Sequence, residues 1–220
     1  MGLVVRVVVV LLLLAGGIAA GWTAGRTEQS PVAEVAEATP LEATPALPYD
    51  PQVPYADDID FPTLQPGLAY ESHTIGTPDN LWSYQVPKRW TSPDEDDEDA
   101  LQIRWQPPGQ PVFGGYSLRL MVVNDNRTPK LMKQHKIIDL ENSPDILDFE
   151  IVSQTDDTVA FRYRTSVGNV LRFNTFRWFA GPDGLARIEM SVVGRERDVP
   201  GLDDLLAKVS ASIRPADQMP

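Results

Sequence analysis

The sequence predicts an α+β domain with a mainly antiparallel sheet and two flanking helices, preceded by one transmembrane helix and a disordered linker. Three observations support this prediction. Residues 7–25 are uninterruptedly apolar, residues 26–66 are rich in proline and acid, and the following residues alternate strand-like segments with two helical segments. A chain of 220 residues is long enough for one well-buried domain with such appendages.

The amino-terminal segment 1–25 is the expected membrane helix. The apolar run from Val7 to Gly25 extends roughly 28 Å as a helix, close to the thickness of the hydrocarbon layer. Arg6 precedes the run, and positive charge on that side favours a cytoplasmic amino terminus. We therefore expect a single-pass signal-anchor in the cell membrane, with the rest of the chain extracytoplasmic. A cleaved signal peptide is the alternative, and it would make the protein secreted.

Residues 26–66 are expected to form a disordered linker. Proline recurs through this stretch, its charge is acidic, and its apolar residues follow no period. Such a composition favours an extended chain without a core. At about 3.1 Å per residue in the polyproline conformation, the linker spans on the order of 100 Å.

Residues 67–215 are expected to fold, with a short tail at 216–220. Alternating apolar residues predict strands at 81–86, 101–106, 117–123, 146–154, 158–166, 170–179 and 185–194. The first helix, 128–140, has Thr128 as its N-cap and Pro129 in its first turn. The closing helix, 200–213, carries an apolar stripe at helical spacing.

The turns suggest a register for the central strands. Gly168-Asn169 suits a two-residue hairpin turn, which pairs Phe161 with Phe176. The loop 180–184 then pairs Phe176 with Ile188. One apolar face results, predicted to be the core beneath the closing helix: Val159, Phe161, Tyr163, Phe176, Trp178, Ala186, Ile188, Met190 and Val192.

The opposite face of this sheet is predicted to gather the candidate anion- or partner-binding residues: Arg162, Arg164, Arg177 and Arg187. In the predicted register Arg177 lies opposite Arg187. Like charges in that position are unfavourable, so a neutralising group is expected. Solvent, or helix acids such as Asp139 and Glu141, are the alternative to an external anion.

Six consecutive carboxylates, Asp94 to Asp99, precede one predicted strand. Asp94, Asp96 and Glu98 match the first ligands of a calcium loop, but that loop needs Gly and Glu where this chain has Asp99 and Trp105. A solvated loop is therefore expected. Calcium binding and an electrostatic role toward the arginine face are the alternatives.

Composition excludes several classes of site. Without cysteine, the chain has no disulfide, thiolate nucleophile or Cys-ligated metal. Its two histidines, His73 and His135, are far apart in the sequence, so no His-rich metal site is expected. A protein that binds nucleic acid needs a surface with net positive charge, whereas the net charge of this chain is −12. Nucleic-acid binding is therefore not expected. No cofactor is expected.

Two stretches resemble a known family. "YQVPKRW" (84–90) and "RIEMSVVGRERDVPGLDDLLAKVSASIR" (187–214) resemble the opening and the ending of actinobacterial extracytoplasmic domains of the Mog/PsbP/LpqN type. The resemblance implies an α/β/α sandwich around an antiparallel sheet. It also implies an accessory or adaptor role, because such proteins assist photosystem assembly, bind a small GTPase or sit at the cell envelope. It brings no catalytic motif.

We therefore expect a non-catalytic domain, held at the membrane by its amino-terminal helix, that binds an envelope protein or an anionic wall polymer. The alternative is a carboxylate-dependent hydrolase or transferase of the envelope. That alternative needs two acids in different environments.

Overall fold

A computed structural model describes residues 54–92, 101–111 and 114–218. These residues belong to one compact unit, Val53–Pro220. The predicted membrane helix, most of the predicted linker and the acidic run Asp94–Asp99 lie outside the described residues. Of the helices that the described residues form, none is long and apolar enough to cross a membrane.

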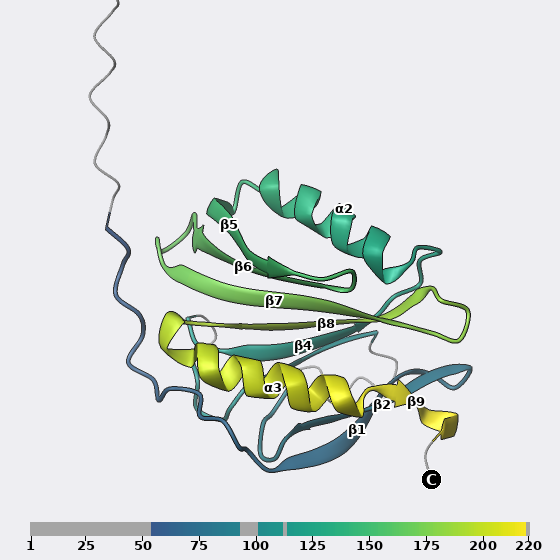
Figure 1. Cartoon of the computed structure of the whole chain (residues 1–220). Helices are drawn as coiled ribbons and strands as arrows, with labels where there is room; N and C mark the ends of the chain where they lie inside the picture. Colours follow the sequence, from purple (N-terminus) through teal and green to yellow (C-terminus); the bar gives the residue numbers. More distant parts are fainter. Residues whose placement is uncertain (1–53, 93–100, 112–113, 219–220) are drawn as a thin grey trace, which may run out of the picture. The chain divides into compact units, whose positions relative to one another are not determined.

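Six antiparallel strands form the main sheet, in the order β3-β4-β8-β7-β6-β5 (Figure 1). Their bounds are Gln102–Trp105 (β3), Ser117–Val122 (β4), Ile146–Gln154 (β5), Thr158–Thr165 (β6), Leu171–Ala180 (β7) and Ala186–Gly194 (β8). A second, smaller antiparallel sheet has the order β1-β2-β9. Its strands are Tyr70–Thr77, Asn80–Pro87 and Arg214–Pro215.

Two α-helices flank the main sheet, α2 (Pro129–Glu141) and α3 (Val199–Ser212). The 3₁₀ turn η1 (Glu196–Asp198) precedes α3, and η2 (Ala216–Gln218) follows β9. Thr128 caps α2 as predicted, because its hydroxyl accepts a hydrogen bond from the Leu131 N–H at 3.5 Å. The predicted class, α+β with mainly antiparallel strands and two helices, is confirmed. The second sheet was not predicted.

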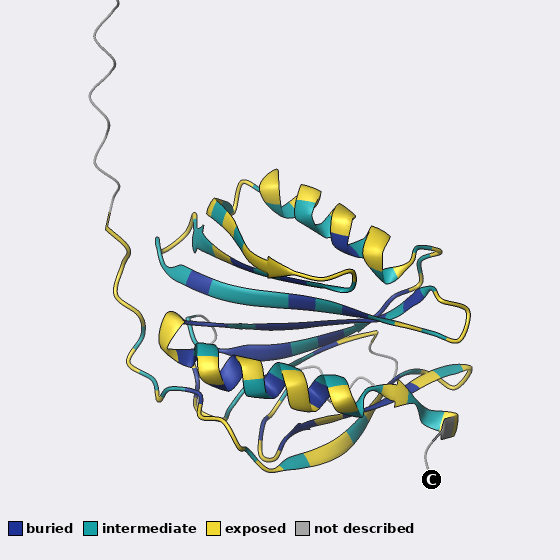
Figure 2. Cartoon of the chain, viewed as in Figure 1, coloured by how far each residue is buried: buried dark blue, intermediate teal, exposed yellow. Residues whose placement is uncertain are grey.

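The main sheet separates two hydrophobic cores. Figure 2 shows buried residues in dark blue along its central strands β4, β7 and β8. The core beneath α3 and the second sheet includes Leu118, Leu120, Val122, Ile188, Met190, Val192, Leu202, Leu205 and Val209. The core beneath α2 includes Val159, Phe161, Phe176, Trp178 and Ala186. The prediction of one apolar face beneath the closing helix is therefore wrong. It merged residues from both faces.

A β-bulge between β7 and β8 explains the error. Ala180 pairs with Ala186, but Phe179 pairs with Ile188, so Arg187 is an extra residue in β8. Side chains alternate along a strand, so one extra residue moves every later side chain of β8 to the opposite face.

The register of the hairpin between β6 and β7 also differs from the predicted one. This difference does not change which face of the sheet each side chain occupies. The Thr165 N–H donates to the Val170 carbonyl, which leaves a four-residue turn instead of two. Phe161 consequently pairs with Asn174 and not with Phe176. A shift of two positions keeps each side chain on its predicted face.

Residues 54–66, predicted as the end of the linker, pack against the domain. Arg195 and Asp198 are fully buried and joined at 2.6 Å. Arg195 also donates to the Phe61 carbonyl at 2.9 Å, and Asp198 accepts the Leu64 N–H at 2.9 Å. Figure 1 shows this segment passing the amino end of α3. The folded unit thus begins upstream of the expected boundary.

Candidate functional site

The structure does not gather the four predicted arginines into one cluster. Arg162 and Arg164 lie on the face of β6 that points away from α2, and Arg177 lies on the same face of β7. Arg187 is the extra residue of the bulge. Arg177 lies opposite Met190, not opposite Arg187, so the predicted like-charge pair does not form.

Each of these arginines has a carboxylate partner within the domain: Arg162 with Glu150, Arg164 with Asp148, Arg177 with Asp157 and Arg187 with Asp183. The partners lie on β5, in the β5–β6 turn and in the β7–β8 loop. They are not the helix acids Asp139 and Glu141. These pairs are at least partly exposed, so each contributes only about 0–1 kcal/mol to stability.

Among the described residues, three carboxyl groups have pKa values below their ordinary range. Burial alone would raise the pKa of Asp157, but hydrogen bonds from two threonine hydroxyls and from Arg177 outweigh it. The Arg187 guanidinium lowers the pKa of Asp183. Burial also opposes ionisation of Asp198, and its pKa is nevertheless lowered by hydrogen bonds from Arg195 and from backbone N–H groups. All three stay ionised as ion-pair partners. A carboxylic general acid needs the opposite shift.

A different group of cations lies on the face of the main sheet that bears α2. The helix packs over β5 and β7, while Arg104 on β3 and Arg119 on β4 remain partly exposed on the same face. Lys136 reaches the same place from α2. We call Arg104, Arg119 and Lys136 the cation cluster.

Glu189 of β8 is the acid at the centre of this region, and its side chain is only 2% exposed. Its Oε1 accepts from Arg119 at 3.2 Å and from Lys136 at 3.3 Å. Its Oε2 accepts from the Trp178 indole N–H at 3.1 Å. Three donors therefore satisfy this buried carboxylate, as a buried charge requires.

Two residues of the cation cluster pack against the aromatic ring of Phe176. The Lys136 Nζ lies 4.7 Å from the centre of the Phe176 ring, and the Arg119 guanidinium lies 5.7 Å from it. Phe176 itself stacks between Phe161 and Trp178, at 6.0 and 5.9 Å. The cation–π contacts and the packed rings together hold two of the three cations in place.

Arg104 differs from the other arginines of the main sheet. It lies directly opposite Arg119 in the β3–β4 register, an unfavourable position for like charges. Among the described residues no carboxylate lies within 4.0 Å of it, whereas the sheet's other arginines each have one. With Glu189 as its one acid among the residues that the structure describes, the cluster has a surplus of two positive charges.

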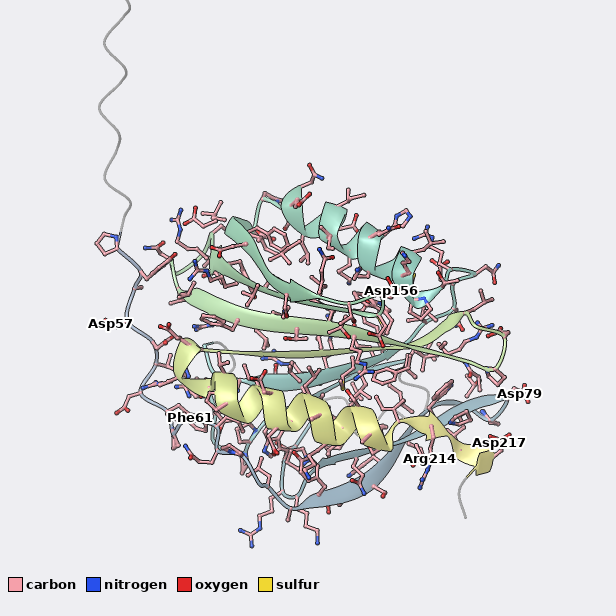
Figure 3. The ribbon with its side chains drawn as sticks, in the orientation of Figure 1. Asp57, Phe61, Asp79, Asp156, Arg214 and Asp217 are labelled. Carbon is pink, nitrogen blue, oxygen red and sulfur yellow. The ribbon has the colours of Figure 1, made fainter. Side chains whose placement is uncertain are left out.

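A hollow of about 590 Å³ lies between the β1–β2 turn, the β7–β8 loop and the chain after β9. Asp79 and Asp217 line it, and both lie with Arg214 at the same end of the molecule (Figure 3). Several of its polar groups are already paired. Asp183 binds Arg187, and the Trp82 indole donates to Asn80 at 2.8 Å.

The described residues contain no group of three or more His, Asp or Glu side chains placed to hold a metal ion. His73 packs edge-on against Trp105, with ring centres 4.6 Å apart, and His135 is exposed on α2. The calcium alternative for Asp94–Asp99 concerns residues outside the described ranges.

Sequence reasoning missed the cation cluster, although a signal was present. Arg104 and Arg119 are the single charged residues of the strands QIRW and SLRLMV. Alternation places each on the face opposite its apolar neighbours. The β3–β4 register was not predicted, because no short turn joins these strands.

No family model and no curated protein matches this chain. Among solved structures it is similar to cyanobacterial PsbP (CyanoP) from Synechocystis sp. PCC 6803, at 12% identity and a TM-score of 0.38, covering 68% of this chain and 94% of that one. It is also similar to LpqN, described as involved in cell envelope biogenesis of Mycobacterium tuberculosis, at 14% identity and a TM-score of 0.38, covering 66% and 92%. Values this low carry no functional inference.

Proposed function

We propose that this chain is a non-catalytic accessory or adaptor domain of the cell envelope that binds an anionic partner, a protein or a wall polymer. Residues 1–25 tether it to the membrane, and the folded domain lies outside the cell. The observation that supports binding is the cation cluster. Among the described residues it is a partly exposed surplus of positive charge, and every arginine of the main sheet other than Arg104 is paired with an acid.

The carboxylates also favour binding over catalysis. Every carboxyl group with a clear pKa shift among the described residues is shifted downward. Each of these groups is an ion-pair partner of a neighbouring arginine. A hydrolase or transferase would use an acid and a base with separated pKa values.

The topology is tested with protease added to intact cells stripped of their wall. We expect the protease to remove the domain while cytoplasmic proteins survive. Full protection of the domain would contradict the extracytoplasmic part of the proposal.

The binding role is tested by affinity capture from solubilised envelopes, with the full chain as bait. We expect reproducible recovery of one envelope protein or polymer, and reduced recovery with Arg104→Gln. Equal recovery by the variant would show that the cation cluster is not the binding surface. Turnover of any substrate in a panel of envelope esters and glycans would favour the enzyme.

A further inference from the structure

We propose that the cation cluster binds a phosphate group, with Arg104 and Arg119 as its principal ligands. This inference rests on the proposed function and names the chemical class of the partner.

Charge balance favours phosphate over a carboxylate. Among the described residues the cluster has three cations and one acid, Glu189, which accepts hydrogen bonds from Arg119 and Lys136. A phosphate monoester carries a charge of about −1.5 to −2 near neutral pH and offers three acceptor oxygens. It can therefore neutralise the surplus of two. A single carboxylate leaves one positive charge uncompensated.

The donors needed for such a ligand are still available. Arg119 uses one of its guanidinium nitrogens on Glu189, and a guanidinium has five N–H donors. Arg104 makes no ion pair among the described residues. Because the two arginines lie directly opposite each other, one phosphate placed between them can accept from both forks.

Pre-organisation also favours a ligand at this place. Glu189 and the ring of Phe176 hold Arg119 and Lys136 before any ligand arrives. Two long side chains therefore lose less conformational freedom on binding. A phosphate oxygen between Arg104 and Arg119 also relieves their mutual repulsion.

The test is an NMR titration of the full chain in micelles of a neutral detergent at low ionic strength. The reporter is the Trp178 indole N–H, which binds Glu189 beside the cluster and is assigned with Trp178→Phe. We expect inorganic phosphate to move this signal, and chloride at matched ionic strength to leave it in place. No movement with phosphate would overturn the proposal.

Two variants make the test specific. Arg104→Gln should weaken phosphate binding at least about tenfold, the loss expected for a charge-assisted hydrogen bond. Arg214→Gln is the matched control, because Arg214 is an exposed strand arginine without an ion pair among the described residues. It changes net charge equally and should bind phosphate as the parent does. Equal affinity of the Arg104 variant and the parent would overturn the proposal.

A second titration with polyphosphate distinguishes the source of the phosphate. Tighter binding of the polymer than of inorganic phosphate supports a polymeric partner, and equal binding per phosphate supports a free phosphate ester. Phosphate binding without capture of any envelope component would contradict the proposed function alone. Capture without phosphate binding would contradict this inference alone.

Discussion

Two buried carboxylates of this domain, Asp198 and Glu189, each accept hydrogen bonds from several donors. Asp198 accepts from three nitrogens of Arg195 and from the Leu64 N–H, and Glu189 accepts from three side chains. Removing one partner of a buried pair leaves the other charge without compensation, which costs far more than breaking an exposed pair.

Asp198→Asn should therefore lower the free energy of unfolding by about 3–5 kcal/mol. The reason is that Arg195 stays fully buried without its counter-charge. Urea unfolding at pH 7 measures the effect. Asp139→Asn on the exposed face of α2 is the control, with an expected change within about 0.5 kcal/mol. A loss below about 1 kcal/mol for Asp198→Asn would show that the pair is dispensable.

The same residue predicts a dependence of stability on pH. The pKa of Asp198 is lower in the folded than in the unfolded state. Its stabilisation is thus fully present above the unfolded value of about 3.9 and is lost as the pH falls below it toward the folded value. We expect the unfolding free energies of parent and Asp198→Asn to converge progressively as the pH falls below about 4. A difference independent of pH would contradict this account.

At the scale of elements, the sequence predicted the existence and type of both helices and of most strands, but the pairing of the strands only in part. The strand Ile146–Gln154 has the predicted bounds, because alternation of apolar residues is a local property. The bulge at Arg187 has no local signature, and it alone moved Ile188, Met190 and Val192 to the other core. The strand Tyr70–Thr77 was missed because its sequence YESHTIGT lacks a clear apolar alternation.

The packing of residues 54–66 was unpredictable for a different reason. The segment contacts the Arg195 and Asp198 side chains through its own backbone groups, which any sequence provides. The proline-rich composition therefore predicts a disordered linker, although hydrogen bonds to Arg195 and Asp198 hold the segment against the domain. The cation cluster could not be predicted either, because it depends on the pairing of β3 with β4. No short turn joins these two strands, so the sequence does not indicate their register.

The contact between this segment and α3 gives an element-scale prediction. A Cβ at Gly201 would lie 2.4 Å from the Leu64 carbonyl oxygen. Alanine normally favours a helix over glycine by about 1 kcal/mol. The clash should reverse that sign, and Gly201→Ala should destabilise the domain by about 1–3 kcal/mol in urea unfolding.

Lys208→Ala, on the exposed side of the same helix, is the matched control for Gly201→Ala and should change stability little. Stabilisation of the domain by Gly201→Ala would show that the Leu64 segment does not pack closely on α3.

At the scale of the whole molecule, charge is distributed unevenly. Net charge is −12, and the six residues Asp94 to Asp99 account for half of it. The cation cluster instead has a local surplus of two positive charges, so an approaching anion meets an attractive site in a repulsive overall field. Such a field acts through solvent and needs no contact between the acidic run and the cluster.

Replacing Asp94–Asp99 with Ser and Asn brings the net charge to −6 and should strengthen phosphate binding at low ionic strength. The gain should fade near 0.15 M salt, where the Debye length is about 8 Å. The Trp178 indole titration measures both conditions. Because the gain acts through ligand bound at the cluster, Arg104→Gln in the neutralised background should remove most of it. A gain that survives 0.15 M salt, or that is unchanged by Arg104→Gln, would mean that the acidic run does not act through the long-range field on this site.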